Sequence, residues 1–181
     1  FADRVVGSVQ LFRASERVTA QEFAAFNGGS SEKFPSTAAI AWVPRVVPEA
    51  RPAFEAAMGA EGEAPAIWAF DQNTDLVMPS TRTGDLYPLR YLATPLAKPR
   101  PIGFDVASTE GGQLMLARAR QAGGPYSSGL VRPRVLPGRP LGIVVAAPVM
   151  LPREAVDAPP AGFVFGFVAT DALVAESARR A

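Results

Sequence analysis

The chain has no cysteine and no histidine among its 181 residues. Without cysteine, the sequence excludes thiol nucleophiles, disulfides, iron–sulfur clusters and cysteine-bound zinc. Without histidine, it also excludes Ser-His-Asp triads, histidine-bound metals and phosphate transfer through histidine. Lysine occurs only as Lys33 and Lys98, and neither lies in a Ser-x-x-Lys motif. A catalytic centre would therefore depend on carboxylates, hydroxyls or these two amines.

Long hydrophobic runs and strong net charge are missing as well. The longest apolar runs, Leu141–Leu151 and Gly162–Ala169, fall short of the ~20 residues that a membrane helix needs. The chain begins at Phe1 without a signal-peptide pattern, so we expect a soluble, processed or excerpted chain with any membrane anchor outside it. With 18 basic and 17 acidic residues, the net charge of +1 argues against nucleic-acid binding. No phosphate-binding glycine motif is present, and we predict no cofactor.

Apolar spacing, cap residues and turn residues predict helices first and strands later. Thr19 and Glu22 form a capping box. Ser108 or Thr109 caps the clearest helix, and Gly123-Gly124 ends it. The predicted helices lie around Val5–Phe12, from Thr19 to Asn27-Gly28-Gly29, and at Thr37–Val43, Glu49–Met58, Ser108–Ala122 and Asp171–Arg180. The predicted strands are Ala66–Phe70, Leu86–Ala93, Tyr126–Val131, Leu141–Met150 and Gly162–Ala169, with an extended connection at 95–101.

This order of elements predicts an α+β fold. A helical N-terminal part precedes five strands, and one helix is inserted between the second and third strand. The order is compatible with a small antiparallel sheet of the PAS-like kind, and other α+β sheets fit it too.

Charge is distributed unevenly along the chain. Six acidic residues and one arginine lie between Glu49 and Asp75, whereas seven basic and two acidic residues lie between Lys98 and Arg139. One interpretation is a pair of solvated faces that attract each other weakly. The other is a basic rim that draws in an anionic ligand.

Few residues suggest chemistry directly. Asp71 and Asp75 could act as an acid–base pair or begin a metal loop, but Asp71-Gln72-Asn73-Thr74-Asp75 has turn composition. The glycine and the closing glutamate of a calcium loop are missing, and we predict no metal site. Trp42 and Trp68 suit a core or an interface, and Trp68 could also stack on a ligand.

Five blocks in a fixed order nevertheless resemble the CHASE domain. CHASE is an extracytoplasmic sensor of bacterial histidine kinases, of cyclic-dinucleotide-metabolising enzymes and of plant cytokinin receptors. The resemblance extends from about Phe12 to Val168. The blocks are Ala41–Val46, Arg51–Glu55, Tyr87–Tyr91, Gly103–Asp105, and Leu116–Ala119 with Gly123.

The resemblance implies a sensor that forms the periplasmic or extracellular portion of an inner-membrane protein, with a membrane helix on each side in the whole protein. It implies a stalk and helical layer at 1–60, a membrane-distal PAS-like ligand-binding part at 61–160, and the start of a membrane-proximal part at 161–181. The family dimerises through its N-terminal helices, and the output is a histidine kinase or a cyclic-dinucleotide enzyme. Pro44 and Pro48 would end a helix so that Trp42 packs on the next one, and Asp105 would cap a helical segment.

The expected ligand pocket lies between the sheet and its flanking helix. The residues that we predict to line it are Ile67, Trp68, Tyr91, Thr94, Leu116, Ser128 and Val144. In cytokinin-binding relatives an acidic residue holds the adenine ring. The matching position here is near Thr94-Pro95, which argues against an adenine-type ligand.

Three hypotheses follow. The first is a small-molecule sensor domain that is not itself an enzyme. The second is a domain of the same kind of receptor that dimerises and has lost its ligand. The third is a carboxylate-dependent enzyme, which needs two acids close together in one cleft.

Overall fold

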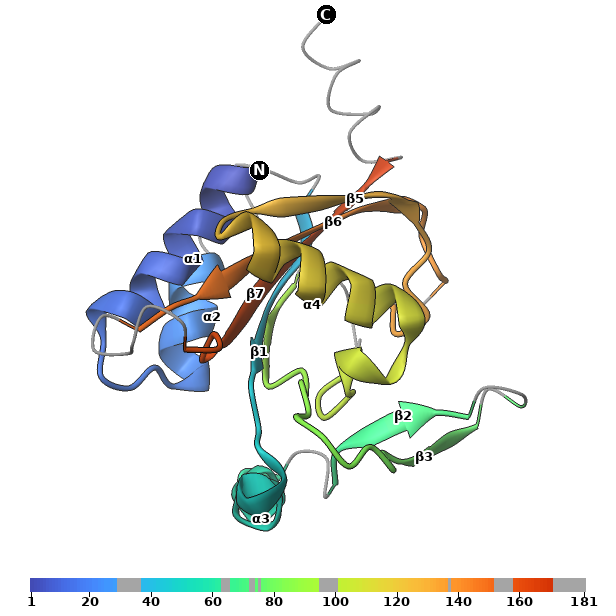
Figure 1. Ribbon diagram of the computed structural model, residues 1–181. Helices are drawn as coiled ribbons and strands as arrows, with labels where there is room; N and C mark the ends of the chain where they lie inside the picture. Colours follow the sequence, from blue (N-terminus) through green and yellow to red (C-terminus); the bar gives the residue numbers. More distant parts are fainter. Residues whose placement is uncertain are drawn as a thin grey trace, which may run out of the picture.

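The computed structural model describes residues 1–28, 37–62, 66–71, 74, 76–94, 101–136, 138–151 and 158–170, and of residues 37 and 38 the backbone alone. Helices and strands alternate along this part of the chain (Figure 1). The helices are α1 (Ala2–Ala14), α2 (Ala20–Gly28), α3 (Arg51–Ala60) and α4 (Glu110–Ala122), with the short 3-10 helices η1 (Pro48–Ala50) and η2 (Val106–Ser108). The strands are β1 (Thr37–Pro44), β2 (Trp68–Phe70), β3 (Val77–Pro79), β4 (Tyr91–Ala93), β5 (Tyr126–Val131), β6 (Gly142–Val149) and β7 (Gly162–Ala169).

Five of these strands form one antiparallel sheet in the order β4-β1-β7-β6-β5. The first and last strands of the sheet in sequence, β1 and β7, lie side by side at its centre. Helix α4 follows the second strand of this sheet in sequence and precedes the third. The predicted α+β class, with an antiparallel PAS-like sheet and one inserted helix, is therefore confirmed.

Helices cover both faces of the sheet (Figure 1). Helix α1 packs on β6 and β7, and α2 packs on β4, whereas α4 lies over β5 and β6 on the opposite face. Because side chains alternate along a strand, Ile40 and Trp42 of β1 face α1 and α2, while Ala39, Ala41 and Val43 face the α4 side.

The core beneath α1 is tightly packed. Val5 and Val9 lie against the sheet, and the Phe12 ring stacks on Trp42 with centroids 4.0 Å apart. Gly166 of β7 allows this close approach. A Cβ atom placed there would lie 2.6 Å from Phe1 Cζ and 2.7 Å from Val5 Cγ2.

The predicted caps are confirmed. The Thr19 amide donates to Glu22 Oε2 over 2.8 Å, and the Glu22 amide donates to Thr19 Oγ1 over 3.2 Å. At the start of α4, Thr109 Oγ1 accepts from the Gly112 amide. At its end, Gly123 adopts the left-handed conformation with φ 64°.

The predicted helix at Thr37–Val43 is wrong, because these residues form the central strand β1. A strand that is buried on both faces is apolar on both sides, so its sequence lacks the alternation that marks a half-exposed strand. Trp42 therefore packs on Phe12 of α1 from within a strand, and Pro44 ends that strand rather than a helix.

Two strand predictions need narrower boundaries. Ala66–Phe70 contains β2, which pairs with β3 in a separate two-stranded sheet and not with the main one. Leu86–Ala93 contains only the short strand β4. Leu86 and Pro88 make isolated bridges there, since a proline cannot donate to a continuous ladder.

The main sheet takes strands from each of the three predicted segments. β1 comes from 1–60, β4 to β6 come from 61–160, and β7 comes from 161–181, so those boundaries do not follow the strand pairing. Helix α1 is 13 residues long and lies along the sheet. The predicted helix Asp171–Arg180, and all but the last residue of the predicted connection at 95–101, lie outside the described residues.

Candidate functional site

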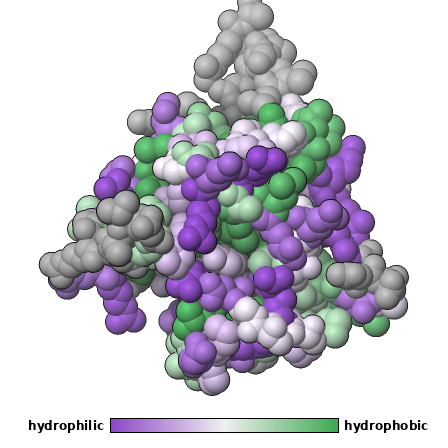
Figure 2. Space-filling model, in the orientation of Figure 1, coloured by the Kyte–Doolittle hydropathy of each residue, from purple (hydrophilic) through white to green (hydrophobic). Residues whose placement is uncertain are grey.

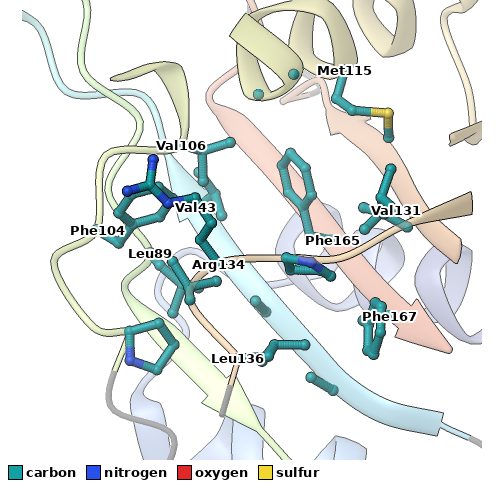
Figure 3. A pocket seen from close by; sticks show the side chains of 18 of the residues that line it. Val43, Leu89, Phe104, Val106, Met115, Val131, Arg134, Leu136, Phe165 and Phe167 are labelled. Carbon is teal, nitrogen blue, oxygen red and sulfur yellow. The ribbon is translucent and has the colours of Figure 1, made fainter. Parts of the chain in front are cut away.

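A pocket of about 350 Å³ opens between the sheet and α4 on the face opposite α1. We call it the sheet pocket. Its floor is formed by β1, β7 and β6, and its sides come from α4 and two connecting segments (Figure 3). Its volume falls within the ~300–1,000 Å³ that is typical of small-molecule sites.

The floor is apolar, and small side chains leave it open. Ala39 and Ala41 occupy two of the three β1 positions that line the pocket, and larger side chains there would fill it. Val144 of β6 and Phe165 and Phe167 of β7 surround these two alanines, with the rings directed at the cavity in Figure 3.

One side of the pocket combines the start of α4 with residues 101–106. Met115 projects from α4, and Phe104 and Val106 line the pocket from the preceding segment (Figure 3). Gly112 lets α4 sit close to that segment, since a Cβ atom there would lie 1.8 Å from the Val106 carbonyl oxygen. This side is therefore built by close backbone packing.

The other side is the end of β5 and the connection from β5 to β6. Val131 of β5 and Leu136 of the connection close it, and Leu136 is buried against Ala39 and Phe167. Arg132 and Arg134 also line the pocket from this connection. The face shown in Figure 2 has hydrophobic surface in a central hollow, with hydrophilic side chains around it.

Asp105 fixes the segment that carries Phe104 and Val106. Its carboxylate is fully buried and accepts from Ser80 Oγ over 2.9 Å, from the Tyr87 amide over 3.0 Å and from the Ala107 amide over 3.1 Å. The predicted capping role of Asp105 is confirmed at η2. The carboxylate thus shapes the pocket wall without facing the cavity.

Ion pairs hold the elements below the pocket. Glu55 Oε1 of α3 accepts from Arg51 Nε and from the Ile67 amide, both over 2.9 Å. Arg90, almost fully buried, reaches Glu61 Oε2 over 2.6 Å. These contacts tie α3 to the start of β2 and to β4, so two of the five sequence blocks serve the frame of the domain.

Another charged pair, separate from those of α3, lies beside Tyr87. Arg45 Nε contacts Asp85 Oδ2 over 2.6 Å, and this hydrogen bond raises the pKa of the Arg45 guanidinium. Burial raises the pKa of the Tyr87 phenol above its ordinary value, and the charge of Asp85 adds to the effect.

Of the seven predicted pocket residues, Ser128 and Val144 line the sheet pocket. The Ser128 hydroxyl accepts from the Val144 amide over 3.0 Å and donates to the Gly129 carbonyl. Ile67 is fully buried in a separate cluster near α3. Trp68 packs on Phe104, and its indole N–H donates to the Ile102 carbonyl over 2.7 Å.

The remaining three predicted residues also lie away from the pocket lining. Tyr91 is on the opposite face of the sheet, where its hydroxyl donates to the Val18 carbonyl over 3.1 Å. Thr94 directly follows β4 and is half-buried. Leu116 is buried between α4 and the sheet, next to Phe163. The prediction missed Ala39 and Ala41 because it assigned their strand to a helix.

Of the two predicted acid–base residues, the structure describes Asp71 alone. Asp71 Oδ1 accepts from the Thr74 amide and hydroxyl, both over 2.8 Å, which is a turn contact. Asp75 lies outside the described residues. Within the described part of the chain, no group of three or more acidic side chains could hold a metal ion.

A second pocket, with a more polar lining, lies at the β2–β3 hairpin. This hairpin pocket, of about 390 Å³, is lined by Phe70, Met78, Arg82 and Gln113 among others. Arg82 Nε lies 3.7 Å from the buried Asp105 carboxylate. Asp105 therefore stands between the two pockets.

The family model of the CHASE domain matches residues 16–181. The chain belongs to the CHASE domain family. CHASE domains are extracellular sensor domains of signalling receptors and are not catalytic modules. The expected resemblance is thereby confirmed, and it covers all the strands of the main sheet.

Similarity to solved structures is distant. A structure described as "Methyl-accepting Chemotaxis protein X" matches with a TM-score of 0.41 and 14% identity. The match covers 97% of this CHASE domain and 60% of that chain, so this chain spans about three fifths of the similar protein. No curated protein matches it in sequence. In the described part of the chain, no helix combines the length and the apolar character needed to cross a bilayer.

Proposed function

We propose that this CHASE domain binds a small molecule in the sheet pocket and that binding changes the position of α1 on the sheet. The observation that carries the proposal is the placement of the two features on opposite faces of the same strands. The pocket lies on the α4 face of β1 and β7, and α1 packs on the other face of the sheet. A shift of these strands on binding therefore changes the seat of α1.

On two strands, adjacent residues connect the pocket face of the sheet with the face that carries α1. On β1, Ala41 faces the pocket while Trp42 stacks on Phe12 of α1. On β7, Phe165 faces the pocket while Gly166 lies under Val5. Since packed interfaces switch between discrete arrangements, a small strand movement is enough to select another position of α1.

At the level of the receptor, the ligand selects one of two pre-existing states of the domain. Two copies pair through α1 and α2 on the periplasmic side of the inner membrane. Flanking membrane helices then carry the change to a cytoplasmic histidine kinase or cyclic-dinucleotide enzyme. The apolar pocket supports this sensor over the alternative of a ligand-free dimerisation domain.

The test is a thermal-shift screen of the folded domain against adenine derivatives, short carboxylates, aromatic acids and sugars. A ligand at 100 times its Kd adds about 2.7 kcal/mol to the free energy of unfolding. For a chain of this length, that raises Tm by about 5–11 °C.

Two variants locate the site. Ala41→Phe fills the pocket floor and should abolish the shift, whereas Ala53→Phe, on the exposed side of α3, should leave it unchanged. Val144→Phe fills the pocket from β6 and serves if Ala41→Phe does not fold. A well-folded domain that no member of the panel stabilises would favour the dimerisation domain instead.

A further inference from the structure

The sheet pocket has an apolar interior and a positively charged edge. Arg132 and Arg134 are the charged residues among those that line it, and no acidic residue is among the described lining residues. Two described acids are next to lining residues in the sequence, and neither is itself among the lining residues. Asp105 is buried behind the wall with Ser80 and Arg82, and Glu110 is exposed at the start of α4.

The two arginines flank Pro133 in the connection from β5 to β6. The Arg134 guanidinium carbon lies 4.5 Å from the centroid of the Phe70 ring, so this side chain reaches across the edge of the pocket toward β2. Figure 3 shows the Arg134 side chain extending toward Phe104. Arg132 Nη1 donates to the Arg139 carbonyl over 3.1 Å, which uses one of its five N–H groups.

The start of α4 adds positive potential at the same cavity. Gly111 and Gly112, at the second and third positions of this 13-residue helix, line the pocket. The amide groups in the first turn of a helix carry the positive end of its dipole. Gly111 has open space where a side chain would project, so a ligand can approach the backbone there.

The volume limits the apolar part of the ligand. A cavity of about 150 Å³ holds benzene, and the sheet pocket has roughly twice that volume. The apolar body therefore corresponds to about two fused rings or a chain of roughly eight carbons. Such a body can be buried against Phe165, Phe167 and Val144, whose side chains offer it no hydrogen-bonding partner.

From these observations we infer that the ligand is an anionic amphiphile, a compact apolar body that ends in a carboxylate. The body lies on the floor of Ala39, Ala41 and Phe165, and the carboxylate lies at the edge near Arg132 and Arg134, while the start of α4 adds positive potential from the other side of the pocket. This inference rests on the proposed function, because it names the ligand class of the same pocket. Of the two interpretations of the basic stretch between Lys98 and Arg139, this inference adopts the basic rim that draws in an anionic ligand.

The test uses pairs of ligands with equal shape and different charge, namely 2-naphthoate with 2-naphthamide and octanoate with octanamide. Calorimetric titration of the folded domain measures each Kd. We expect each carboxylate to bind at least tenfold more tightly than its amide, because a charge-assisted hydrogen bond is lost with the charge. The aromatic and the alkyl pair together show which apolar body the pocket prefers.

Charge-removing variants locate the carboxylate. Arg134→Gln and Arg132→Gln should each weaken binding of the carboxylates about tenfold or more and leave the amides within threefold. Arg118→Gln is the matched control, since Arg118 is exposed on α4 and does not line the pocket. Ala41→Phe should abolish binding of all four compounds.

The outcomes separate the two proposals. If the amides bind as tightly as the carboxylates, and Ala41→Phe abolishes both, the anionic ligand is wrong and the sensor pocket stands. If a neutral or polar compound of the screen binds in an Ala41-dependent way while no carboxylate does, the conclusion is the same. If carboxylates bind but Ala41→Phe has no effect, both proposals about this pocket fail.

Discussion

The contact between α1 and β7 leads to a sharp prediction about Gly166. In the variant Gly166→Ala, the new methyl group would lie 2.6 Å from Phe1 Cζ, 2.7 Å from Val5 Cγ2 and 3.2 Å from Ile40 Cδ1. Phe1 is partly exposed and can turn away, but Val5 is fully buried. Relief of the clash with Val5 therefore requires α1 to move away from the sheet.

The size of the effect follows from this packing. Overpacking a core costs ~1–3 kcal/mol, and we expect ~2 kcal/mol because side chains rather than backbone atoms give way. For a chain of this length, each kcal/mol lowers Tm by about 2–4 °C, so Gly166→Ala should lower it by about 4–8 °C. Amide exchange of α1 should increase at the same time, since the helix loses its close seat.

Gly129→Ala is the matched control. Gly129 also lies in a strand of the main sheet, but no atom lies within 4 Å of the position that its Cβ would take. We expect the Tm of this variant to equal or slightly exceed that of the parent, because alanine restricts the unfolded chain. If both variants have the Tm and the α1 exchange of the parent, the described seat of α1 on β7 is wrong.

Three further predictions concern polar groups. Asp105→Ala leaves the Tyr87 and Ala107 amides and the Ser80 hydroxyl without their acceptor. The free energy of unfolding, measured by urea titration, should therefore fall by ~3 kcal/mol or more. A loss below about 1 kcal/mol would contradict the hydrogen-bond network around Asp105. The hydrogen bonds from Thr19 lower the pKa of Glu22, so its contribution to stability is present above the unfolded pKa and disappears as pH falls through the folded one; an unshifted Glu22 pKa in an NMR titration would contradict the capping box. Burial and Asp85 raise the pKa of Tyr87, so the folded state loses stability as pH rises above the ordinary tyrosine value near 10, and Tyr87→Phe should lessen that loss in alkaline thermal melts.

Local signals in the sequence predicted a large part of the fold. The capping box at Thr19 and Glu22, the cap at Thr109 and the glycine at 123 act through neighbouring backbone groups, so the sequence alone locates the helix ends. β5 and β7 match their predicted bounds, and β6 is within one residue at each end. Turn residues and uninterrupted apolar runs made these strands recognisable.

The central strand could not be predicted in the same way. Ala39, Ala41 and Val43 alternate with Ile40 and Trp42, so every position is apolar and no periodicity remains. Alanine also favours helices in isolation. Only pairing with β4 and β7, which are distant in sequence, decides that this segment is a strand.

The wrong assignment of β1 explains why most of the predicted residues lie away from the sheet pocket. The prediction takes Ala66–Phe70 as the first strand of the sheet and includes Ile67 and Trp68 among the pocket residues, whereas Ala39 and Ala41 lie on the strand that comes first in the sheet. Tyr91 was assigned to the pocket although its side chain faces α2. Ser128 and Val144, whose strands were assigned correctly, do line the sheet pocket.

The methionines allow the most direct measurement of the central claim, that a small molecule enters the sheet pocket. The chain has four, and three of them report on different places. Met115 lines the sheet pocket, Met78 lines the hairpin pocket, and Met58 is buried in the cluster with Ile67. In a chain labelled with ¹³C-methyl methionine, compounds that raise Tm should shift the Met115 signal in a saturable way and leave Met58 unchanged. If stabilising compounds shift Met78 while Met115 does not respond, the sheet pocket is not the ligand site.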